Sequence, residues 1–585
     1  MRRGRFSLRM LGYTIGLIFL VVVGLAAWIS SRAIQVRNDL NVLRSEFVAL
    51  QNALGDQSGQ KVGDALADLA RTTRDADQAT NDPIWRSMRH IPLVGRSFVT
   101  TSGMVRELTS DVNGPIKTLS EVKLSLAPDQ VRASNGTLNL HVITDAVPRL
   151  RAAATALIES NDRLRKLPHS AMLGSVVKER DKLVTEGANL AASVTSAADA
   201  AEVSAHLLGA DGRRRYFVGI QDNAESRGTG GAIGAYVILR VDHGAFTIEK
   251  SGVAEELKDA PSDVVDLGPD YKAAWGKFHP NSTWSGSNRS GTFAYAAQNW
   301  IGLLKAQAPT LKFDGALALD PVMLSQLMTL TGPVQIRGGI TISPDKVLAT
   351  TETFEYSLIN TDAKRHIVMQ DITTAVFSKL FKGSGESGAL VSTFLDGAAK
   401  DHFMVYSSDA AAQSVIETTS FLGGPPKDER VYSSSIINNI GGTKLDSYLN
   451  EVVAYSSSCS SGARTGKVVL RLRNNVSAKA IPLVGLRRDA KPGTYTLGQD
   501  RLLVTIYGSR GGSLTKLTLD GKEMTPTVGT EDGHPIWSVD LTVDPSQERV
   551  ITADTTEPST GARATLRLQG LAKPVDATLD LIPCT

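Results

Sequence analysis

Acidic side chains, an arginine and a glycine cluster follow closely on the apolar run 216–220. They precede a second apolar run, 235–241, and comprise Asp222, Glu225, Arg227, Gly228, Gly230, Gly231 and Gly234. Glycine tolerates positive φ, so backbone here can approach a ligand closely. Carboxylates and a guanidinium beside such backbone supply groups for proton transfer and anion binding. We interpret the segment as two strands joined by a polar, glycine-rich turn that forms part of a site.

The same residues also fit a structural role. Glu225 and Arg227 could form a salt bridge that only holds the turn, and such a bridge contributes little when exposed. The glycine cluster lacks a Walker lysine and a dinucleotide-binding spacing. No His/Cys/Asp set has metal-ligand spacing, and no Gly-x-Ser-x-Gly elbow indicates a serine hydrolase. Trp284 in the loop 282–288 allows a carbohydrate-stacking loop, but an ordinary surface loop is favoured.

The elements around this turn alternate between strands and helices, which predicts an α/β domain over 209–428. His243 and Gly244 form the expected hairpin turn before a third strand. The predicted strands are 215–221, 235–241, 245–250, 313–319 and 332–336, and the predicted helical stretches are 292–308, 321–330 and much of 345–382.

Residues 429–585 show period-two alternation with Gly, Asn and Asp turns, which predicts a β-sandwich domain. This part contains the only two cysteines of the chain, Cys459 and Cys584. In an oxidising exterior we expect them to form one disulfide, with two free thiols as the alternative.

The N-terminal part predicts a membrane anchor. A cytoplasmic tail (1–9) with four arginines precedes a transmembrane helix (10–30), whose uncharged run of twenty residues spans about 30 Å. The arginines favour a cytoplasmic N-terminus, which leaves the bulk of the chain outside the cell membrane. A cleaved signal peptide is the alternative, although its apolar run would be only about 7–15 residues long.

A helical stalk or bundle is predicted over 31–208, with a short coiled-coil-like seam at 40–54. The balance of 63 basic against 60 acidic residues gives a net charge of +3, which does not indicate nucleic-acid binding.

Several segments resemble known families. The stretch 221–234 is similar to a Gln-Asn-x-x-Glu-x-Arg-x-x-Gly-Gly-x-x-Gly signature, with Asp222 as one extra residue. That signature belongs to an uncharacterised family of actinobacterial membrane proteins known only as a domain of unknown function. A later Asn-x-Gly-Gly-Thr-Lys segment matches 439–444, which ends in Lys444. The resemblance covers most of 75–480, and 438–444 is expected to be a loop that packs the two exterior domains together.

The region 210–420 also resembles, more remotely, the LytR-CpsA-Psr domains. The opening strand and turn, the segment 313–336 and the helix around 355–370 carry this resemblance. It implies transfer of a glycan from a polyprenyl pyrophosphate carrier to the cell wall, with arginines on the pyrophosphate and an aspartate that assists catalysis or binds Mg²⁺. The chain departs from that pattern at three or more charged positions, one of which is Val368.

By position, the resemblance assigns catalytic roles to Asp222, Glu225 and Arg227. Substrate binding would fall to Gly230, Gly231, Asp362, Arg365 and Lys444. For Arg365 the favoured alternative is a solvated helix face shared with Asp362, Lys364 and Asp371.

The sequence thus predicts a membrane-anchored, extracytoplasmic envelope protein with a stalk, a LytR-CpsA-Psr-like α/β domain and a β-sandwich. It would bind or transfer polyprenyl-linked glycopolymers in cell-wall biogenesis. A non-enzymatic envelope scaffold with a degenerate ligase-like domain is the alternative.

Overall fold

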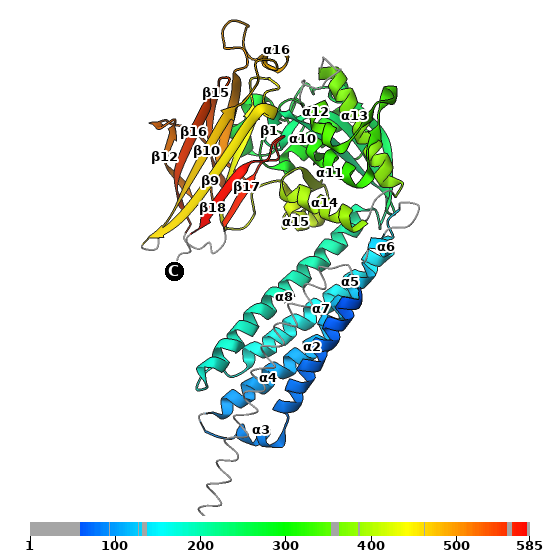
Figure 1. Ribbon diagram of the computed structural model, residues 1–585, viewed down its shortest axis with the longest axis vertical. Coiled ribbons are helices and arrows are strands. Elements are labelled where there is room, and N and C mark those ends of the chain that lie inside the picture. Colours follow the sequence, from blue (N-terminus) through cyan, green and yellow to red (C-terminus); the bar gives the residue numbers. More distant parts are fainter. Residues whose placement is uncertain are drawn as a thin grey trace, which may run out of the picture. The chain divides into compact units, whose positions relative to one another are not determined.

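The computed structural model describes most of the chain beyond its N-terminal region. The described residues are 59–92, 94–126, 128–131, 137–352, 362–383, 387–460, 463–558 and 564–581. The chain divides into two units, Met1–Val131 with His141–Glu202, and Arg132–Leu140 with Val203–Thr585. The protein has a mixed α/β fold with several sheets and helices (Figure 1).

The first unit is helical. Asp82 accepts a hydrogen bond from the backbone N–H of Ile84, and Pro83 begins the next helix, so the chain turns sharply here. The helices are α2 (Gly59–Thr80), α3 (Pro83–Met88), α4 (Gly95–Asp111), α5 (Lys117–Ser125), α6 (Pro128–Val131), α7 (Leu140–Lys166) and α8 (Gly174–Leu207). A π-helical turn (Val112–Ile116) that contains Pro115 connects α4 to α5. The expected coiled-coil seam at 40–54 lies outside the described residues.

Small side chains fill the core of this unit. Ala153 on α7 and Ala198 on α8 belong to one buried cluster with Val122 of α5. Alanines let neighbouring helices approach closely, and period-3.6 patterning places them on the inner face. The unit therefore matches the packed helical region expected from the sequence.

The second unit begins with a five-stranded sheet in the described part of the chain. Its order is β3-β2-β1-β4-β7, with β1 parallel to β4 and the other neighbours antiparallel. The strands are β1 (Arg214–Arg227), β2 (Gly230–Asp242), β3 (Ala245–Val253), β4 (Gly315–Leu319) and β7 (Phe403–Ser407). The β2–β3 connection is the expected hairpin, with positive φ at His243 and Gly244.

Helices cover both faces of this sheet because side chains along β1 alternate between two cores. Phe217 packs with Trp300 of one face, whereas Val218 and Ile220 pack with the other. The first face is covered by α10 (Phe293–Gln307), and the second by α11 (Pro321–Thr331) and α13 (Asp362–Phe381). Further elements are α9 (Pro269–Trp275), α12 (Val347–Thr351), α14 (Ser387–Ala399), α15 (Ala410–Ile416) and the small β5–β6 pair (Val334–Gln335, Thr341–Ile342).

Two further sheets face each other in the remainder of the described chain. Their orders are β13-β12-β16-β10-β9-β18 and β14-β15-β11-β8-β17, and they share one apolar core. The strands are β8 (Val431–Asn439), β9 (Leu449–Ser460), β10 (Ala463–Asn474), β11 (Asp500–Tyr507), β12 (Ser513–Leu519), β13 (Lys522–Glu523), β14 (Thr527–Glu531), β15 (His534–Val543), β16 (Glu548–Glu557), β17 (Ala564–Leu568) and β18 (Asp576–Leu581), with the short helix α16 (Ile481–Val484). We call this part the sandwich.

The polar segment after Ile220 is not the long turn that the sequence suggested. Strand β1 continues to Arg227, and β2 starts at Gly230, so only two residues turn. The pairing skips 223–225, since Asp222 pairs with Ala232 and Ser226 with Gly231. This bulge accommodates the polar residues inside the strand, which is why composition alone suggested a turn.

Three other expectations concern the exterior and the surface. Trp284 is not on a surface loop, because its ring is buried against Phe217 and its Nε1 donates to the carbonyl of Lys258. Cys459 on β9 is disulfide-bonded, while Cys584 lies outside the described residues. Within the described ranges no helix is both long and apolar enough to cross a membrane, and the predicted anchor at 10–30 lies outside those ranges.

Candidate functional site

The predicted site residues gather at the end of the β1–β2 hairpin. Asp222 lies at the edge of the bulge, where its Oδ2 is 2.8 Å from Nζ of Lys444. The same ammonium group is 3.0 Å from Oε2 of Glu225. All three side chains are buried. Lys444 comes from the loop after β8, so the sequence correctly grouped residues that lie far apart in the chain.

Arg227 lies two residues after Glu225 on β1, and the two side chains form an ion pair. Its guanidinium also donates to the carbonyls of Ser226 and Asn439, each at 3.0 Å. The salt bridge considered from the sequence is therefore present, and it is buried. Charge-assisted hydrogen bonds at a buried position hold the side chain in one orientation.

Arg365 on α13 reaches the same place, because one of its terminal nitrogens lies 3.9 Å from Oδ2 of Asp222. The side chain is only 1% exposed, so the favoured expectation of a solvated helix face is wrong for this residue. Lys364 is exposed and Asp371 pairs with Arg337, as expected for an outer face. Asp362 is the first residue of α13, and its side chain is outside the described part.

Gly230 and Gly231 allow the two strands to close around the bulge. Gly230 has φ of 125°, which favours glycine. A Cβ on Gly231 would lie 2.2 Å from the carbonyl oxygen of Asp222. These glycines therefore bring backbone against backbone, and their predicted contact with a substrate stays a prediction.

Glu352 and His366 also lie near Asp222, but the sequence did not indicate either residue as part of the site. Glu352 follows α12 directly, is 1% exposed, and accepts no hydrogen bond at either carboxylate oxygen from the described residues. His366 lies 3.9 Å from Asp222 through Nε2, and its Nδ1 is 2.8 Å from Glu255. No local pattern marks a lone glutamate after a short helix as buried. We call Asp222, Glu225, Arg227, Glu352, Arg365 and Lys444 the Asp222 cluster.

The pKa values of the three carboxyl groups of the cluster are shifted in opposite directions. Burial opposes ionisation of Asp222, but the charges of Lys444 and Arg365 outweigh it and lower its pKa. Glu225 is likewise buried, and Lys444 and Arg227 lower its pKa. Burial and the neighbouring charge of Asp222 raise the pKa of Glu352 well above its usual value. One neutral acid thus lies beside ionised carboxylates, an arrangement that can separate proton donor from acceptor.

A second acidic pair lies on the sandwich side of the hairpin end. The backbone N–H of Ser226 donates to Asp446, and the Asn439 amide donates to both Asp446 and Asp500. Asn439 is held in this orientation because its Oδ1 accepts from the N–H of Gly442. Burial raises the pKa of both acids, and the charge of Asp446 raises that of Asp500 further. Of the two carboxyl groups, Asp500 thus has its pKa raised both by burial and by the charge of its neighbour.

The hairpin end is thus enclosed by the sandwich. Asn438 accepts from the N–H of Gly228, Gln569 donates to the carbonyl of Arg227, and Asn223 donates to the carbonyl of Gly570. These bonds satisfy polar groups that would otherwise be buried without partners. The segment 438–444 takes part in this packing, since the carbonyl of Asn439 accepts from Arg227 and Lys444 binds Asp222.

Mg²⁺ does not fit the Asp222 cluster as its described residues stand. The ammonium of Lys444 lies between Asp222 and Glu225, where a cation would need their oxygens. Within the described ranges, no group of three or more His, Cys, Asp or Glu side chains is arranged to hold a metal ion.

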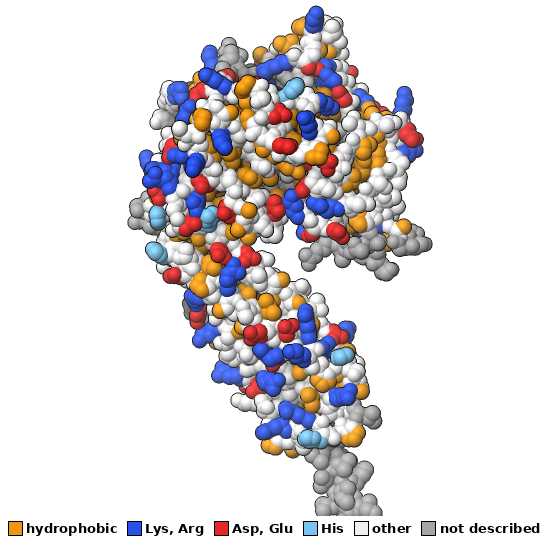
Figure 2. All heavy atoms as spheres, turned by 180° about the vertical axis from the view of Figure 1, so that it is seen from behind, with side chains coloured by type: hydrophobic (Ala, Val, Ile, Leu, Met, Phe, Trp, Pro, Cys, Tyr) orange, Lys and Arg blue, Asp and Glu red, His pale blue; other side chains and the backbone are white. Residues whose placement is uncertain are grey.

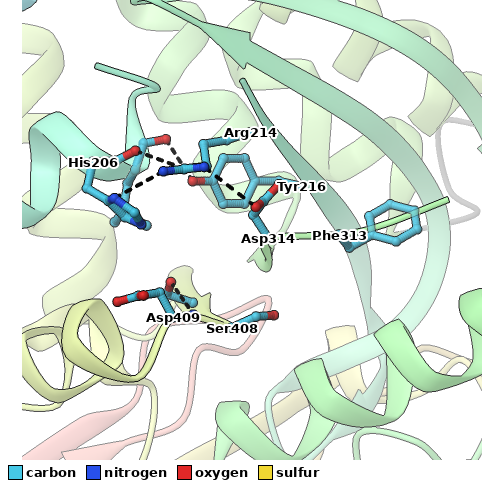
Figure 3. A pocket seen from close by; sticks show the side chains of 9 residues that line it. His206, Arg214, Tyr216, Phe313, Asp314, Ser408 and Asp409 are labelled. Carbon is cyan, nitrogen blue, oxygen red and sulfur yellow. Dashed lines mark hydrogen bonds and ion pairs between the residues drawn. The ribbon is translucent and has the colours of Figure 1, made fainter. Parts of the chain in front are cut away.

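A separate polar cavity of about 270 Å³ lies near the start of β1 (Figure 3). Its charged groups are engaged with one another. Arg214 bonds to Asp211 and lies 3.9 Å from Asp314, while Asp409 accepts from the N–H of Ala412 at the start of α15. Tyr216 donates to the carbonyl of Leu207. The polar groups that line the cavity thus have partners within the fold.

Comparisons with known proteins give a family model that matches part of the chain and a distant solved structure. No curated protein matches the chain. A search of solved structures gives the X-ray structure of the Lin1025 protein from Listeria innocua, with 12% identity, 38% of this chain and 85% of that chain covered, and a TM-score of 0.19. Residues 211–356 match the model of a family described as protein of unknown function (DUF4012), a narrower span than the resemblance expected over 75–480.

Proposed function

We propose that this protein is a membrane-anchored, extracytoplasmic protein that binds polyprenyl-phosphate-linked glycopolymers of the cell envelope at the Asp222 cluster. One observation carries the proposal. Three basic side chains from separate elements, Arg227, Arg365 and Lys444, converge on one buried place at the end of the sheet. Guanidinium and ammonium groups are the side chains that proteins use to hold phosphate oxygens.

The charge balance of the cluster supports an anionic ligand. Its basic groups number three, while Asp222 and Glu225 are held ionised and Glu352 is held neutral. Three positive charges against two negative charges leave one positive charge in a buried setting. Such a setting strengthens attraction for a phosphate because little water screens it.

The order of elements supports the same class of ligand. A strand with an acid and an arginine at its end and a later helix with Arg365 resemble the LytR-CpsA-Psr arrangement, whose members handle polyprenyl-linked glycans. A transfer reaction would in addition use Glu352 as proton donor beside ionised Asp222. Phosphoryl transfer depends mainly on positioning and charge neutralisation, which this cluster supplies.

The test is lipid analysis of the full chain purified from native membranes. We expect polyprenyl phosphates to co-purify with the wild-type protein and to fall at least tenfold in Arg365→Met. Arg337→Met is the matched control, since Arg337 pairs with Asp371 on the outer side of the same helix and is 62% exposed. Absence of polyprenyl phosphate from the wild-type protein, or equal amounts in both variants, contradicts the proposal.

A second candidate function is a non-enzymatic envelope scaffold. The enclosure of the hairpin end favours it, because Gly228, Arg227 and Asn223 all bond to the sandwich and leave the end of β1 fixed. In that case Arg365→Met changes thermal stability alone, and a strain that carries it retains its wild-type surface glycopolymers.

A further inference from the structure

A projection of the sandwich carries exposed leucines. It comprises residues 479–497, includes α16, and is called the leucine lobe. Leu483 is 51% exposed, Leu486 54% and Leu497 47%. Apolar side chains gathered on one projection differ from the scattered single leucines of ordinary surfaces.

The leucines are held near one another by a close backbone crossing. The N–H of Gly498 donates to the carbonyl of Gly485, and a Cβ on Gly485 would lie 2.7 Å from the Cα of Gly498. Leu486 and Leu497 adjoin these two glycines in sequence. The crossing therefore brings the two segments that carry these leucines close together.

The lobe is also ordered by its own contacts. The guanidinium of Arg487 binds Asp489 through two bonds, of 2.9 and 2.7 Å, and lies 5.0 Å from the ring centroid of Tyr495. The hydroxyl of Tyr495 in turn accepts from the N–H of Arg487. The leucines are thus presented on a shaped surface, which lowers the entropy cost of contact with a partner.

The lobe is strongly basic. It contains Lys479, Arg487, Arg488 and Lys491 and a single acid, Asp489, so four positive charges and one negative charge give +3. Figure 2 shows basic and hydrophobic side chains together on the projection at the top of the view. Leucines beside an excess of basic groups complement a surface that is anionic outside and apolar beneath.

We propose that the leucine lobe docks on an anionic phospholipid surface. The leucines enter the boundary between head groups and acyl chains, and the basic side chains contact lipid phosphates. The lobe packs directly on the loop of the Asp222 cluster, because the N–H of Lys444 donates to the carbonyl of Val484 and that of Arg488 to Gly441. This inference goes beyond the proposed function, since it concerns the membrane surface and no glycopolymer.

The test uses the full chain reconstituted into vesicles. A fluorophore on Thr496→Cys, an exposed position of the lobe, reports its surroundings. With phosphatidylglycerol vesicles we expect a blue shift and quenching by lipids that carry a quencher at shallow acyl depth. With phosphatidylcholine alone both signals should be several-fold smaller.

Two variants separate the apolar from the electrostatic contribution. Leu483→Ser with Leu486→Ser should abolish the acyl-depth quenching, while Lys479→Gln with Lys491→Gln should weaken the contact roughly fivefold per charge removed and flatten its salt dependence. All four positions are exposed, so unchanged melting temperatures verify the fold.

Three outcomes would overturn the proposal. One is a water-exposed fluorophore in both lipids, and another is equal signals in the variants. The third is a response only to native membranes that contain envelope proteins, which would assign the lobe to a protein partner. Loss of polyprenyl phosphate in Arg365→Met tests the proposed function separately.

Discussion

Lys444 and Asp222 are separated by 222 positions in the sequence, yet the ammonium nitrogen lies 2.8 Å from a carboxylate oxygen in a buried setting. The pair joins the central strand of the α/β sheet to the first loop of the sandwich. Glu225 shares the same ammonium, so a single lysine compensates two buried carboxylates.

Replacement of Lys444 by methionine should therefore destabilise the protein strongly. It removes one partner of a buried ionic group and leaves Asp222 and Glu225 less compensated, which costs about 3–5 kcal/mol. Thermal denaturation of the purified full chain measures the change. Lys427→Met is the control, because Lys427 pairs with Asp532 near the surface and its loss should cost about 0–1 kcal/mol. Similar losses in both variants would contradict this account.

A methyl group at Gly231 should disturb the hairpin end. The Cβ would lie 2.2 Å from the carbonyl oxygen of Asp222, and backbone there cannot move without breaking the bulge. We expect Gly231→Ala to lower stability by about 2 kcal/mol or more. Gly276→Ala is the matched control, since its Cβ would meet only the side chain of Lys272 at 3.4 Å. Equal melting temperatures for the two variants would show that the bulge is not so constrained.

The raised pKa of Asp500 beside Asp446 predicts a pH-dependent gain in stability from Asp500→Asn. The pKa of Asp500 in the folded protein is raised above its unfolded value, so folding loses stability as the pH rises from the unfolded pKa through the folded one. An amide can donate to Asp446 and still accept from Thr443, as the protonated acid does. The variant should therefore be the more stable protein at pH 8 and should lose that advantage near pH 4. Denaturation at both pH values tests this prediction, and a stability advantage that does not depend on pH would show that the pKa of Asp500 is not raised in the folded protein.

Glu451 gives a second pH-dependent prediction inside the sandwich. Burial raises its pKa to about 7, against a small opposing effect of its hydrogen bond from Ser435. The folded state thus holds a proton that the unfolded state has already lost above about pH 4.5. The resulting penalty is absent below that pH, grows as the pH approaches 7, and is complete above it, at roughly 2–3 kcal/mol.

Glu451→Gln removes this penalty. We expect the variant and the wild-type protein to denature alike near pH 4 and the variant to be more stable above pH 7. Measurement of unfolding across this range gives the pKa directly. A difference that is constant with pH would show that Glu451 does not titrate in the folded state.

Much of the fold could be predicted from local pattern. Continuous apolar runs indicated β1 and β2, and alternating apolar residues indicated the sandwich strands. The helix predicted over 321–330 corresponds to α11, which begins at Pro321.

The candidate site was predicted in part for a physical reason. Asp222, Glu225 and Arg227 lie on one strand and could be grouped by spacing, whereas the bulge that buries them depends on the partner strand. Arg365 has charged neighbours on its helix, so periodicity suggested solvent although a tertiary contact buries it. Glu352 has no local signal at all, since its burial comes from elements distant in the chain.

The enclosure of the hairpin end has a consequence for the order in which the chain matures. During synthesis the β1–β2 hairpin is made long before its partners, because Lys444 follows Asp222 by 222 residues and Gly570 follows Asn223 by 347 residues. Until then Asp222, Glu225 and Arg227 remain hydrated, and the α/β sheet cannot complete its folding alone. A chain truncated before the sandwich would therefore contain an incompletely folded α/β sheet. Folding of this sheet would be completed only after the C-terminal strands have been synthesised.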